Sequence, residues 1–246
     1  MLLTLGPDTL LLYFARSDDL NDMILDNTNQ ARCNICGGTQ FELGPNDRKS
    51  GTGKPPRCKR CQSLERHRQL RQVYAQLPDR YLAGLEVLQL SADIGVDPAW
   101  FNSYEVSVFQ RDNSLDLEAI DRADASYDLV ICNHVLEHVA NDRKGLQELM
   151  RITRPGGFIQ ITVPTPYTRA VTVDWGYPRE EAHGHYRGYG KDFLQLFSQV
   201  EPGAMALQVE AIDEVTGAGG YVYLWSSDTA LMRQLRAWII NPIVAG

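Results

Sequence analysis

The stretch Tyr127–Pro164, YDLVICNHVLEHVANDRKGLQELMRITRPGGFIQITVP, decides the fold of this 246-residue chain. Its first part, Asp128–Cys132, is a short continuous apolar run, which predicts a strand buried on both faces of a parallel sheet. Apolar residues then recur at helical spacing over Val135–Ile152, and the Pro and Gly of Arg154–Gly157 are typical of a helix end. Phe158–Val163 predicts a second buried strand.

A strand, a crossover helix and a second parallel strand form a βαβ unit, whose connection is right-handed in nearly all proteins. Such a unit predicts an open α/β sheet, in which small ligands bind beyond the carboxyl ends of the strands. Asn133 and His134 directly follow the first strand of this unit. We therefore expect them to lie at a ligand-binding edge.

Three features of this stretch resemble the class I S-adenosylmethionine (SAM)-dependent methyltransferases of the type 11 kind. They are the aspartate that opens a strand in Tyr127–Val130, the box HVLEHV at His134–Val139, and RPGG at Arg154–Gly157. The resemblance implies an α/β, Rossmann-like class I methyltransferase fold, with a mostly parallel sheet, an antiparallel last strand and SAM as cofactor. The alternative is a βαβ unit from another doubly wound fold.

Length and composition permit one large domain, or a main domain with an appendage. An apolar content of 43% suffices for a full core, and a net charge of −7 argues against nucleic-acid contact over the whole surface. The opening Met1–Arg16 is apolar but interrupted, so it predicts neither a membrane span nor a signal peptide. Thr9–Ala15 predicts a strand or a helix packed on the main body. We expect a cytoplasmic protein.

Four of the five cysteines form two Cys-x2-Cys pairs, Cys33 with Cys36 and Cys58 with Cys61. Four thiolates can surround one Zn²⁺ tetrahedrally with no open position, as in a structural zinc site. The segment between the pairs is rich in Gly and Pro, as a ribbon hairpin requires. Two disulfides or unligated thiols are the alternatives, and disulfides fit poorly without a secretion signal. Cys132 lies in a predicted strand, so we expect it in the core.

A helix is expected over Ser63–Ala75, with Ser63 as its N-cap. One face is apolar, and the other carries a basic set: Arg66, His67, Arg68 and Arg71. We interpret the basic face as solvated, with arginines paired to the acidic domain; a nucleic-acid patch is the alternative. The predicted organisation is an N-terminal segment (1–30), a zinc ribbon (31–64), a linker helix (65–80) and a methyltransferase domain (81–246). This combination resembles a subgroup of bacterial methyltransferase-like proteins over most of residues 33–200.

The resemblance also implies which residues would hold SAM. Leu85–Leu90 predicts the first core strand, and the loop after it is poorer in glycine than is usual in the family. An acidic residue after the next strand would accept hydrogen bonds from the ribose hydroxyls, and a later one would meet the adenine amino group. The candidate cofactor residues are Gln89, Ser91, Ala92, Gly95, Asp112, Asp116, Asn133 and His134.

Tyr104–Gln110 alternates like a strand, and only seventeen residues separate Gln110 from Asp128. Either the usual helix and third strand are shortened here, or Tyr104–Gln110 is itself the third strand. Towards the end of the chain, Lys191–Val200 predicts a helix. Two antiparallel strands and a last helix are expected over Ala206–Ile212, Gly220–Trp225 and Leu231–Ile240.

Thr165–Gly190 is a long segment rich in Tyr, Trp, His and Arg, and such loops are usually functional or disordered. We expect an irregular substrate lid over the cofactor. His183 or His185 would act as general base, because imidazole accepts a hydroxyl proton near neutral pH. His134 is a third candidate catalytic residue. A packing loop whose histidines bond only to the backbone is the alternative.

Two pairs in this region also have the residue types that bind divalent cations. The first is Glu137 with His138, for which we expect a structural role, with the carboxylate near the N-terminus of the helix. The second is His183 with His185, for which no further ligand is obvious nearby. A metal site at either pair is therefore an alternative that the sequence leaves open.

The resemblance implies in-line transfer of a methyl group from SAM, largely by positioning the two reactants. The Asn-Pro-Pro-Tyr type tetrad that marks amino methylation of bases is absent, since Asn133–Leu136 stands in its place. We therefore predict O-methylation of a small molecule or sugar. The alternative is a non-catalytic methyltransferase-like module whose zinc ribbon docks a protein or nucleic-acid partner. A nucleic-acid methyltransferase ranks last because the chain is acidic.

Overall fold

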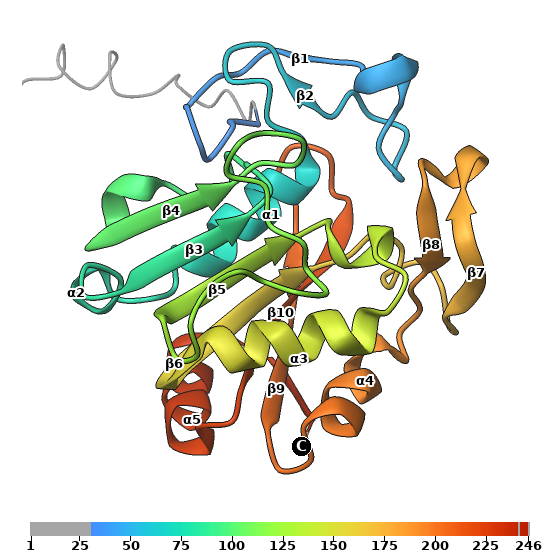
Figure 1. The fold of residues 1–246 in the computed structure, drawn as a ribbon. Helices are drawn as coiled ribbons and strands as arrows, with labels where there is room; N and C mark the ends of the chain where they lie inside the picture. The colour runs from blue at the N-terminus through green and yellow to red at the C-terminus, as the bar shows by residue number, and fades with distance from the viewer. Residues whose placement is uncertain (1–30, 241, 246) are drawn as a thin grey trace, which may run out of the picture. The chain divides into compact units, whose positions relative to one another are not determined.

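A computed structural model describes residues 31–240 and 242–245 of the chain. The expected N-terminal segment 1–30, with the strand or helix at Thr9–Ala15, lies outside these residues. Residues 32–246 cluster as one compact unit. Its centre is a seven-stranded sheet in the order β11-β9-β10-β6-β5-β3-β4, accompanied by two separate two-stranded sheets (Figure 1).

The strands of the main sheet are β3 (Glu86–Leu90), β4 (Ser103–Ser107), β5 (Tyr127–Asn133), β6 (Thr153–Thr162), β9 (Met205–Ile212), β10 (Gly219–Ser226) and β11 (Ile243–Ala245). The helices are α1 (Glu65–Tyr74), α2 (Asp79–Leu82), α3 (Asp142–Ile152), α4 (Phe193–Val200) and α5 (Thr229–Trp238). The small sheets pair β1 (Phe41–Glu42) with β2 (Arg57–Cys58), and β7 (Val173–Arg179) with β8 (His185–Gly188). Four single-turn 3-10 helices are η1 (Pro45–Asp47), η2 (Pro98–Trp100), η3 (Leu136–His138) and η4 (Glu180–Ala182).

The predicted mostly parallel sheet with an antiparallel end is confirmed. β4, β3, β5 and β6 run parallel, whereas β10, β9 and β11 pair antiparallel. The β5-α3-β6 unit is the βαβ unit expected from the sequence, with Leu129 opposite Phe158 and Asn133 opposite Thr162. The carboxyl ends of the parallel strands therefore meet at one edge, as an α/β ligand site requires.

Helices cover both faces of the sheet, which explains why the central strands are continuously apolar. Along β5, Leu129 and Ile131 join the core beneath α1 and α5, while Val130 and Cys132 join the core beneath α3 and α4. This alternation follows from the two-residue period of a strand. Cys132 is fully buried, as predicted.

The predicted helix over Val135–Ile152 is wrong in its first part. Residues 136–138 form the single turn η3, and α3 begins only at Asp142. The side chain of Asn141 accepts a hydrogen bond from the amide of Lys144 at 3.0 Å, so Asn141 is the N-cap. Apolar residues of a 3-10 turn and of a helix have similar spacing, which explains the misplaced start. Glu137 consequently does not lie in the first turn of an α-helix.

The sheet ends at β4, which settles the question of the short interval before Asp128. β4 pairs with β3 and occupies the sheet edge, so it corresponds to the second strand of the resemblance. Residues 108–126 contain neither a helix nor a strand, and the usual third strand is missing among the described residues. Leu117 and Ile120 of this segment are buried against the core under α3 instead.

The expected loop over Thr165–Gly190 is more regular than predicted, because it contains the β7–β8 hairpin. The last helix runs over Thr229–Trp238 and is followed by β11 at the sheet edge. Within the described ranges, no helix is long and apolar enough to cross a membrane.

Candidate active site

The four predicted zinc cysteines lie together in the ribbon formed by β1, β2 and their flanking turns. The Sγ atoms of Cys33 and Cys61 are 3.7 Å apart, and those of Cys36 and Cys58 are 3.5 Å apart. All four Sγ atoms lie within 4.8 Å of one another. Thiolates about 2.3 Å from one Zn²⁺ at tetrahedral angles are about 3.8 Å apart. A disulfide requires about 2.05 Å, so the cluster fits a zinc ion and not two disulfides.

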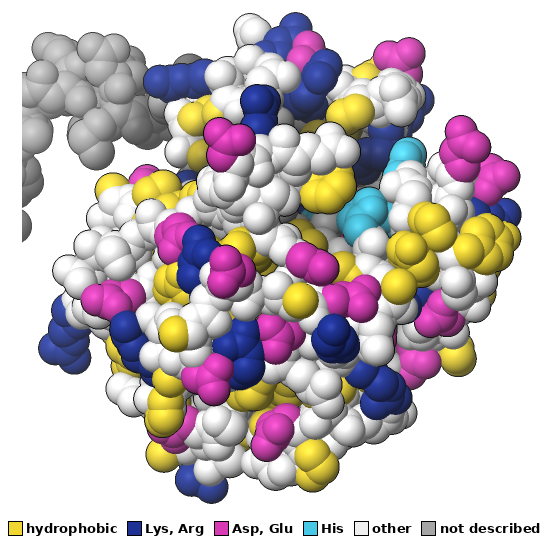
Figure 2. Space-filling view, viewed as in Figure 1, with side chains coloured by type: hydrophobic (Ala, Val, Ile, Leu, Met, Phe, Trp, Pro, Cys, Tyr) yellow, Lys and Arg dark blue, Asp and Glu magenta, His cyan; other side chains and the backbone are white. Residues whose placement is uncertain are grey.

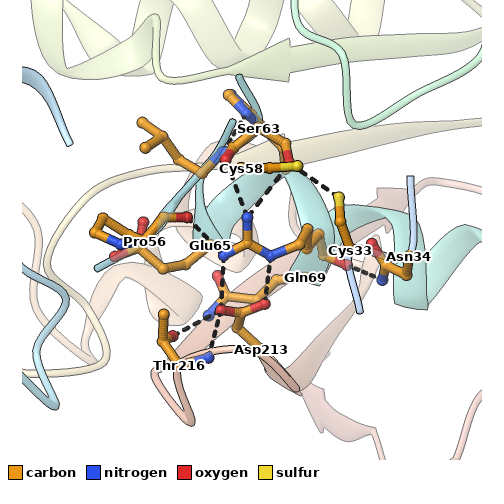
Figure 3. Close-up of polar contacts among 12 residues, drawn as sticks. Cys33, Asn34, Pro56, Cys58, Ser63, Glu65, Gln69, Asp213 and Thr216 are labelled. Carbon is orange, nitrogen blue, oxygen red and sulfur yellow. Dashed lines mark hydrogen bonds and ion pairs between the residues drawn. The ribbon is translucent and has the colours of Figure 1, made fainter. Parts of the chain in front are cut away.

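A buried arginine joins the ribbon to the main sheet (Figure 3). Arg68 of α1 is 1% exposed, and its Nε and Nη2 atoms donate to the two carboxylate oxygens of Asp213 at 2.7 and 2.9 Å. Nη2 also donates to the carbonyl of Pro56, and Nη1 donates to the carbonyl and hydroxyl oxygens of Ser63. The ribbon, α1 and the β9–β10 connection are therefore held by one guanidinium.

The environment of Arg68 corrects two expectations. Ser63 is not the N-cap of α1, because its hydroxyl lies 3.2 Å from the Sγ atoms of both Cys33 and Cys61. The amide of Leu64 instead donates to Nδ1 of His67 at 3.0 Å. The basic face of α1 is also not uniformly solvated, since His67 and Arg68 are buried while Arg66 is exposed.

Burial and hydrogen bonding act in opposite directions on this network. Burial alone would raise the pKa of Asp213, but hydrogen bonds from Arg68 and Thr216 lower it below its usual value. His67, which precedes Arg68 in α1, is also buried, and burial lowers the pKa of its imidazole to about 4. His67 is therefore neutral at physiological pH, and its Nδ1 is free to accept the Leu64 amide.

A cavity of about 1010 Å³ opens at the carboxyl ends of β3, β4 and β5. Its lining includes Ser91, Ser107, Asp116, His134 and His138, and the β7–β8 hairpin contributes Pro178, His183, Gly184 and Tyr186. We call this the sheet-edge cavity. Its position is the one expected for a ligand of an open α/β sheet. The hairpin lies where the sequence predicted a lid.

Three of the predicted cofactor residues line the sheet-edge cavity, namely Ser91, Asp116 and His134. Ser91 takes a left-handed φ of 68°, a conformation that glycine usually supplies, and its amide donates to the carbonyl of Ser107 at 2.9 Å. In this glycine-poor loop, a serine therefore adopts the left-handed conformation that a glycine usually supplies. Asp116 is exposed to the cavity and accepts a hydrogen bond from the amide of Glu118.

The other predicted cofactor residues lie outside the cavity lining. Gln89 is fully buried, where its amide bonds to the carbonyl of Ser91 and its carbonyl accepts from Tyr104. Ala92 and Asp112 are exposed in loops between the strands. Gly95 lies against α1, because a Cβ there would come within 3.0 Å of the carbonyl of His67. That contact explains the glycine by packing.

Asn133 is buried beside the site rather than on its surface. Its Oδ1 accepts from Gln160 at 2.9 Å and from the hydroxyl of Thr162 at 2.8 Å. Its Nδ2 has no hydrogen-bond partner among the described residues. Buried amide nitrogens are nearly always paired, so this donor is available to a bound group.

A second cavity of about 620 Å³ lies between the ribbon, α1 and the end of β6. It is lined by Arg48, Gly51, Thr52, Glu65, Arg66, Gln69, His134, His183 and the segments 162–168 and 217–222. We call this the ribbon cavity. Arg48 binds Glu65 through two hydrogen bonds of 2.8 and 2.7 Å, and Thr52 donates to the carbonyl of Thr216 at 2.6 Å. The ribbon is thus fixed as a wall of this cavity.

Two histidines belong to the linings of both cavities, His134 after β5 and His183 before β8. Both have left-handed backbones, with φ values of 53° and 60°. The amide of His134 donates to the carbonyl of Thr162 at 2.9 Å, which fixes it at the edge of the sheet. The two cavities are therefore adjacent at this pair, which we call their junction.

Four of the five histidines of the chain gather around these cavities. Figure 2 shows histidine side chains at the surface on this side of the molecule. The rings of His138 and His185 meet edge to face with centroids 4.6 Å apart, and those of His183 and His185 are 6.1 Å apart. Burial lowers the pKa of His185, and the neighbouring histidines add to this effect although Glu137 opposes it. His185 lines neither cavity, in contrast to His183.

Several residues of the site could not be found from the sequence. Arg66 lines the ribbon cavity and forms no hydrogen bond or ion pair with any described residue. Ser107 ends β4 at the position where the resemblance implies an acidic residue, and its hydroxyl accepts from the amide of Leu115 at 3.0 Å.

The family model described as a methyltransferase domain matches residues 64–200, more than half of the chain. Comparison with the curated proteins gives no match. Among solved structures, the chain resembles an S-adenosylmethionine-dependent methyltransferase from Mesorhizobium loti, with 12% identity, coverage of 63% of this chain and 95% of that chain, and a TM-score of 0.46.

It also resembles a 1,6-didemethyltoxoflavin-N1-methyltransferase from Burkholderia thailandensis with bound 1,6-didemethyltoxoflavin and S-adenosylhomocysteine. That similarity has 15% identity, coverage of 64% of this chain and 77% of that chain, and a TM-score of 0.44. Together with the sheet order and the matched span, the family match shows that the chain belongs to the SAM-dependent methyltransferases of class I fold. The matched span begins one residue before α1 and therefore includes this helix.

Proposed function

We propose that this enzyme binds SAM in the sheet-edge cavity and transfers its methyl group to a hydroxyl of a small molecule or sugar in the ribbon cavity. The observation that carries the proposal is the junction of the two cavities at His134 and His183. A methyl donor in one cavity and an acceptor in the other would meet at this point. A non-catalytic binding module would not require two cavities that share residues in this way.

The residues of the sheet-edge cavity fit SAM in chemistry and size. Its volume of about 1010 Å³ is ample for a ligand of this size. Asp116 offers a carboxylate to the adenine amino group, and the turn at Ser91 allows close approach of the backbone. The unpaired Nδ2 of Asn133 is a further donor. The ribose role assigned to Asp112 has less support, because Asp112 is not part of the lining.

The ribbon cavity favours a polar acceptor. Its volume of about 620 Å³ matches a small molecule, and its walls come from separate parts of the chain that only the folded protein brings together. Arg66 presents a guanidinium with no hydrogen-bond or ion-pair partner among the described residues, and this group would bind a carboxylate, a phosphate or sugar hydroxyls. A nucleic-acid partner is less consistent with a net charge of −7.

The residues at the junction would position the reactants. Bound SAM supplies a methyl group already activated by its positive sulfur. His183 would take the proton of the attacking hydroxyl, because it lines both cavities and is exposed to them. His134 would hold the acceptor oxygen on the line of attack. The β7–β8 hairpin would exclude water from the sheet-edge cavity. His185 is a weaker candidate for the base, since it lines neither cavity.

We also propose that Cys33, Cys36, Cys58 and Cys61 hold one structural Zn²⁺. Its role would be to fix the ribbon wall of the acceptor cavity. Purified protein should contain one zinc per chain, measured by mass spectrometry of the metal, and Cys58→Ser should lower that content. A wild-type protein without zinc, purified with and without added metal, would contradict this assignment.

The test of the cofactor site is calorimetric titration of zinc-loaded protein with SAM and with S-adenosylhomocysteine. We expect micromolar binding that Ser91→Trp abolishes and Asp116→Ala weakens by about tenfold, the effect of a lost charged hydrogen bond. Asp112→Ala is the matched control and should bind as the wild type does. No binding of either compound at millimolar concentration would overturn the proposed function and favour a binding module.

A further inference from the structure

Glu137 carries a buried carboxylate that the fold leaves partly unpaired. The side chain is 1% exposed, and its Oε1 lies 3.4 Å from Nδ1 of His134. Its Oε2 has no hydrogen-bond partner among the residues that the structure describes. Burying a carboxylate oxygen without a partner is strongly unfavourable, so a bound group or ion is expected beside it.

Two imidazoles converge on the same carboxylate. One ligand atom each from Glu137, His138 and His185 lie within 4.8 Å of one another. Neither imidazole forms a hydrogen bond within the described part of the chain, although their rings are in edge-to-face contact. Ligands about 2.0–2.2 Å from one metal ion lie about 3–4 Å apart, so small side-chain rotations would bring the three atoms to one ion.

The backbone around these residues is rigidly held. Arg187, two residues after His185 on β8, is 2% exposed and donates to the carbonyls of Val139 and Ala140 at 2.8 and 2.7 Å. A longer hydrogen bond of 3.4 Å reaches the carbonyl of Leu136. The strand that carries His185 is thereby fixed to the turn that carries Glu137 and His138. Such outer contacts orient the ligands in metal sites.

We propose that Glu137, His138 and His185 bind a divalent transition-metal ion beside the junction of the two cavities. Two imidazoles and one carboxylate form the ligand set of catalytic zinc and non-haem iron centres, and this set leaves coordination positions open. Imidazole favours zinc, iron, cobalt or nickel over magnesium and calcium. The site is separate from the four cysteines, which offer no open position.

The position of the site defines its use and rests on the proposed function. His138 lines the sheet-edge cavity, and His134, the neighbour of Glu137, lines both cavities. The acceptor hydroxyl would reach from the ribbon cavity past His134 to an open position of the ion, which would lower the pKa of the hydroxyl. Its proton passes to His183, its oxygen forms a bond to the methyl carbon, and the carbon–sulfur bond breaks with its electron pair remaining on sulfur. The products are a methyl ether and S-adenosylhomocysteine, and the ion keeps its oxidation state.

The ion should also select the acceptor. Two neighbouring open positions are best filled by two oxygens on adjacent carbons, as in a catechol or a vicinal diol of a sugar. The ion would therefore favour acceptors with paired hydroxyls over isolated alcohols. This narrows the substrate class within the proposed hydroxyl methylation.

The test is titration of the full, zinc-loaded chain with Co²⁺ alone, followed by calorimetry and visible absorption. We expect one equivalent to bind without a thiolate charge-transfer band, which separates this site from the cysteine cluster. Glu137→Gln, His138→Asn and His185→Asn should each weaken binding by at least about 10–100-fold, as even outer-shell changes do. His183→Asn is the matched control, because it removes a neighbouring imidazole that is not a ligand.

His138 is exposed, so His138→Asn keeps the test valid if the buried Glu137 variant fails to fold. Adding 3,4-dihydroxybenzoate to the Co²⁺-loaded protein should shift the Co²⁺ bands. Absence of Co²⁺, Mn²⁺ and Zn²⁺ binding at millimolar concentration, or equal affinity in wild type and the three ligand variants, would overturn the proposal. An unchanged spectrum with the catechol would overturn the acceptor role. Since no SAM is present, these results are independent of the cofactor test.

Discussion

Replacing Arg68 by methionine should destabilise the protein more than any single surface change. The variant keeps much of the side-chain volume but leaves Asp213, itself 1% exposed, without its two charged hydrogen bonds. Thr216 continues to donate to Oδ2 from its amide and its hydroxyl, so the carboxylate is not wholly unpaired. Removing one partner of a buried ion pair costs about 3–5 kcal/mol. For a domain of this size that loss lowers Tm by roughly 6–20 °C.

The assay is guanidinium chloride unfolding of zinc-loaded Arg68→Met, with Arg233→Met as control. Arg233 is exposed on α5, so its substitution should change stability by less than about 0.5 kcal/mol. Arg68→Met with Asp213→Asn should recover part of the loss, since the double variant buries no unpaired charge. Zinc should also leave Arg68→Met faster, because Ser63 connects Arg68 to Cys33 and Cys61. A loss below about 1 kcal/mol would refute the account of Arg68 as the link between ribbon and sheet.

Three further outcomes test the fold. Gly157→Ala should lower the free energy of unfolding by about 1–3 kcal/mol in a denaturation assay, because its Cβ would lie 2.6 Å from a carbonyl oxygen of β5. Gly51→Ala is the control and should be neutral, because its Cβ would meet nothing within 4 Å. The free energy of unfolding should fall by up to about 3 kcal/mol as the pH drops from 6.5 to about 4. Burial lowers the pKa of His67 in the folded protein, so the imidazole of the unfolded chain is protonated first. His67→Gln should therefore flatten the pH profile of the denaturation midpoint. Asn141→Ala should lower stability by about 1 kcal/mol through loss of the α3 cap, against no change for the exposed Gln147→Ala in thermal unfolding.

The parts of the fold that the sequence predicted correctly depend on local patterns. Asp128–Cys132 and Phe158–Val163 are apolar without interruption, and only a strand covered on both faces requires that. The two cysteine pairs identify their cluster because each pair is close in sequence. Both patterns can be recognised in a single sequence without comparison to homologues.

Errors arose where a local pattern has two structural solutions. Val135 and Val139 fit a helix, yet the same spacing suits η3 and the turn after it, and the cap at Asn141 decides where α3 begins. The missing third strand is a similar case. A stretch of polar turns with Leu117 and Ile120 covers the core without forming a strand, and no periodicity reveals that.

The candidate site was predicted less well because it depends on contacts across the chain. A helical pattern predicts that charged residues face the solvent. Arg68 is nevertheless buried, where it pairs with Asp213, 145 residues away in the sequence. Gly95 looked like a cofactor-loop glycine, yet its close contact with α1 accounts for it. The hairpin turns His185 towards His138, a contact that the sequence did not predict.

The two cavities differ in what they require from the chain. The sheet-edge cavity is built from the ends of the parallel strands and the hairpin, so any sequence that forms this sheet provides most of it. The ribbon forms one wall of the ribbon cavity, and Arg68, Arg48 and Thr52 hold it against α1 and the β9–β10 connection. On the proposed function, cofactor binding would depend on the fold, and acceptor choice would depend on the ribbon wall together with the proposed ion. A zinc ion in the ribbon would influence chemistry by keeping that wall in place, although it lies outside both cavities.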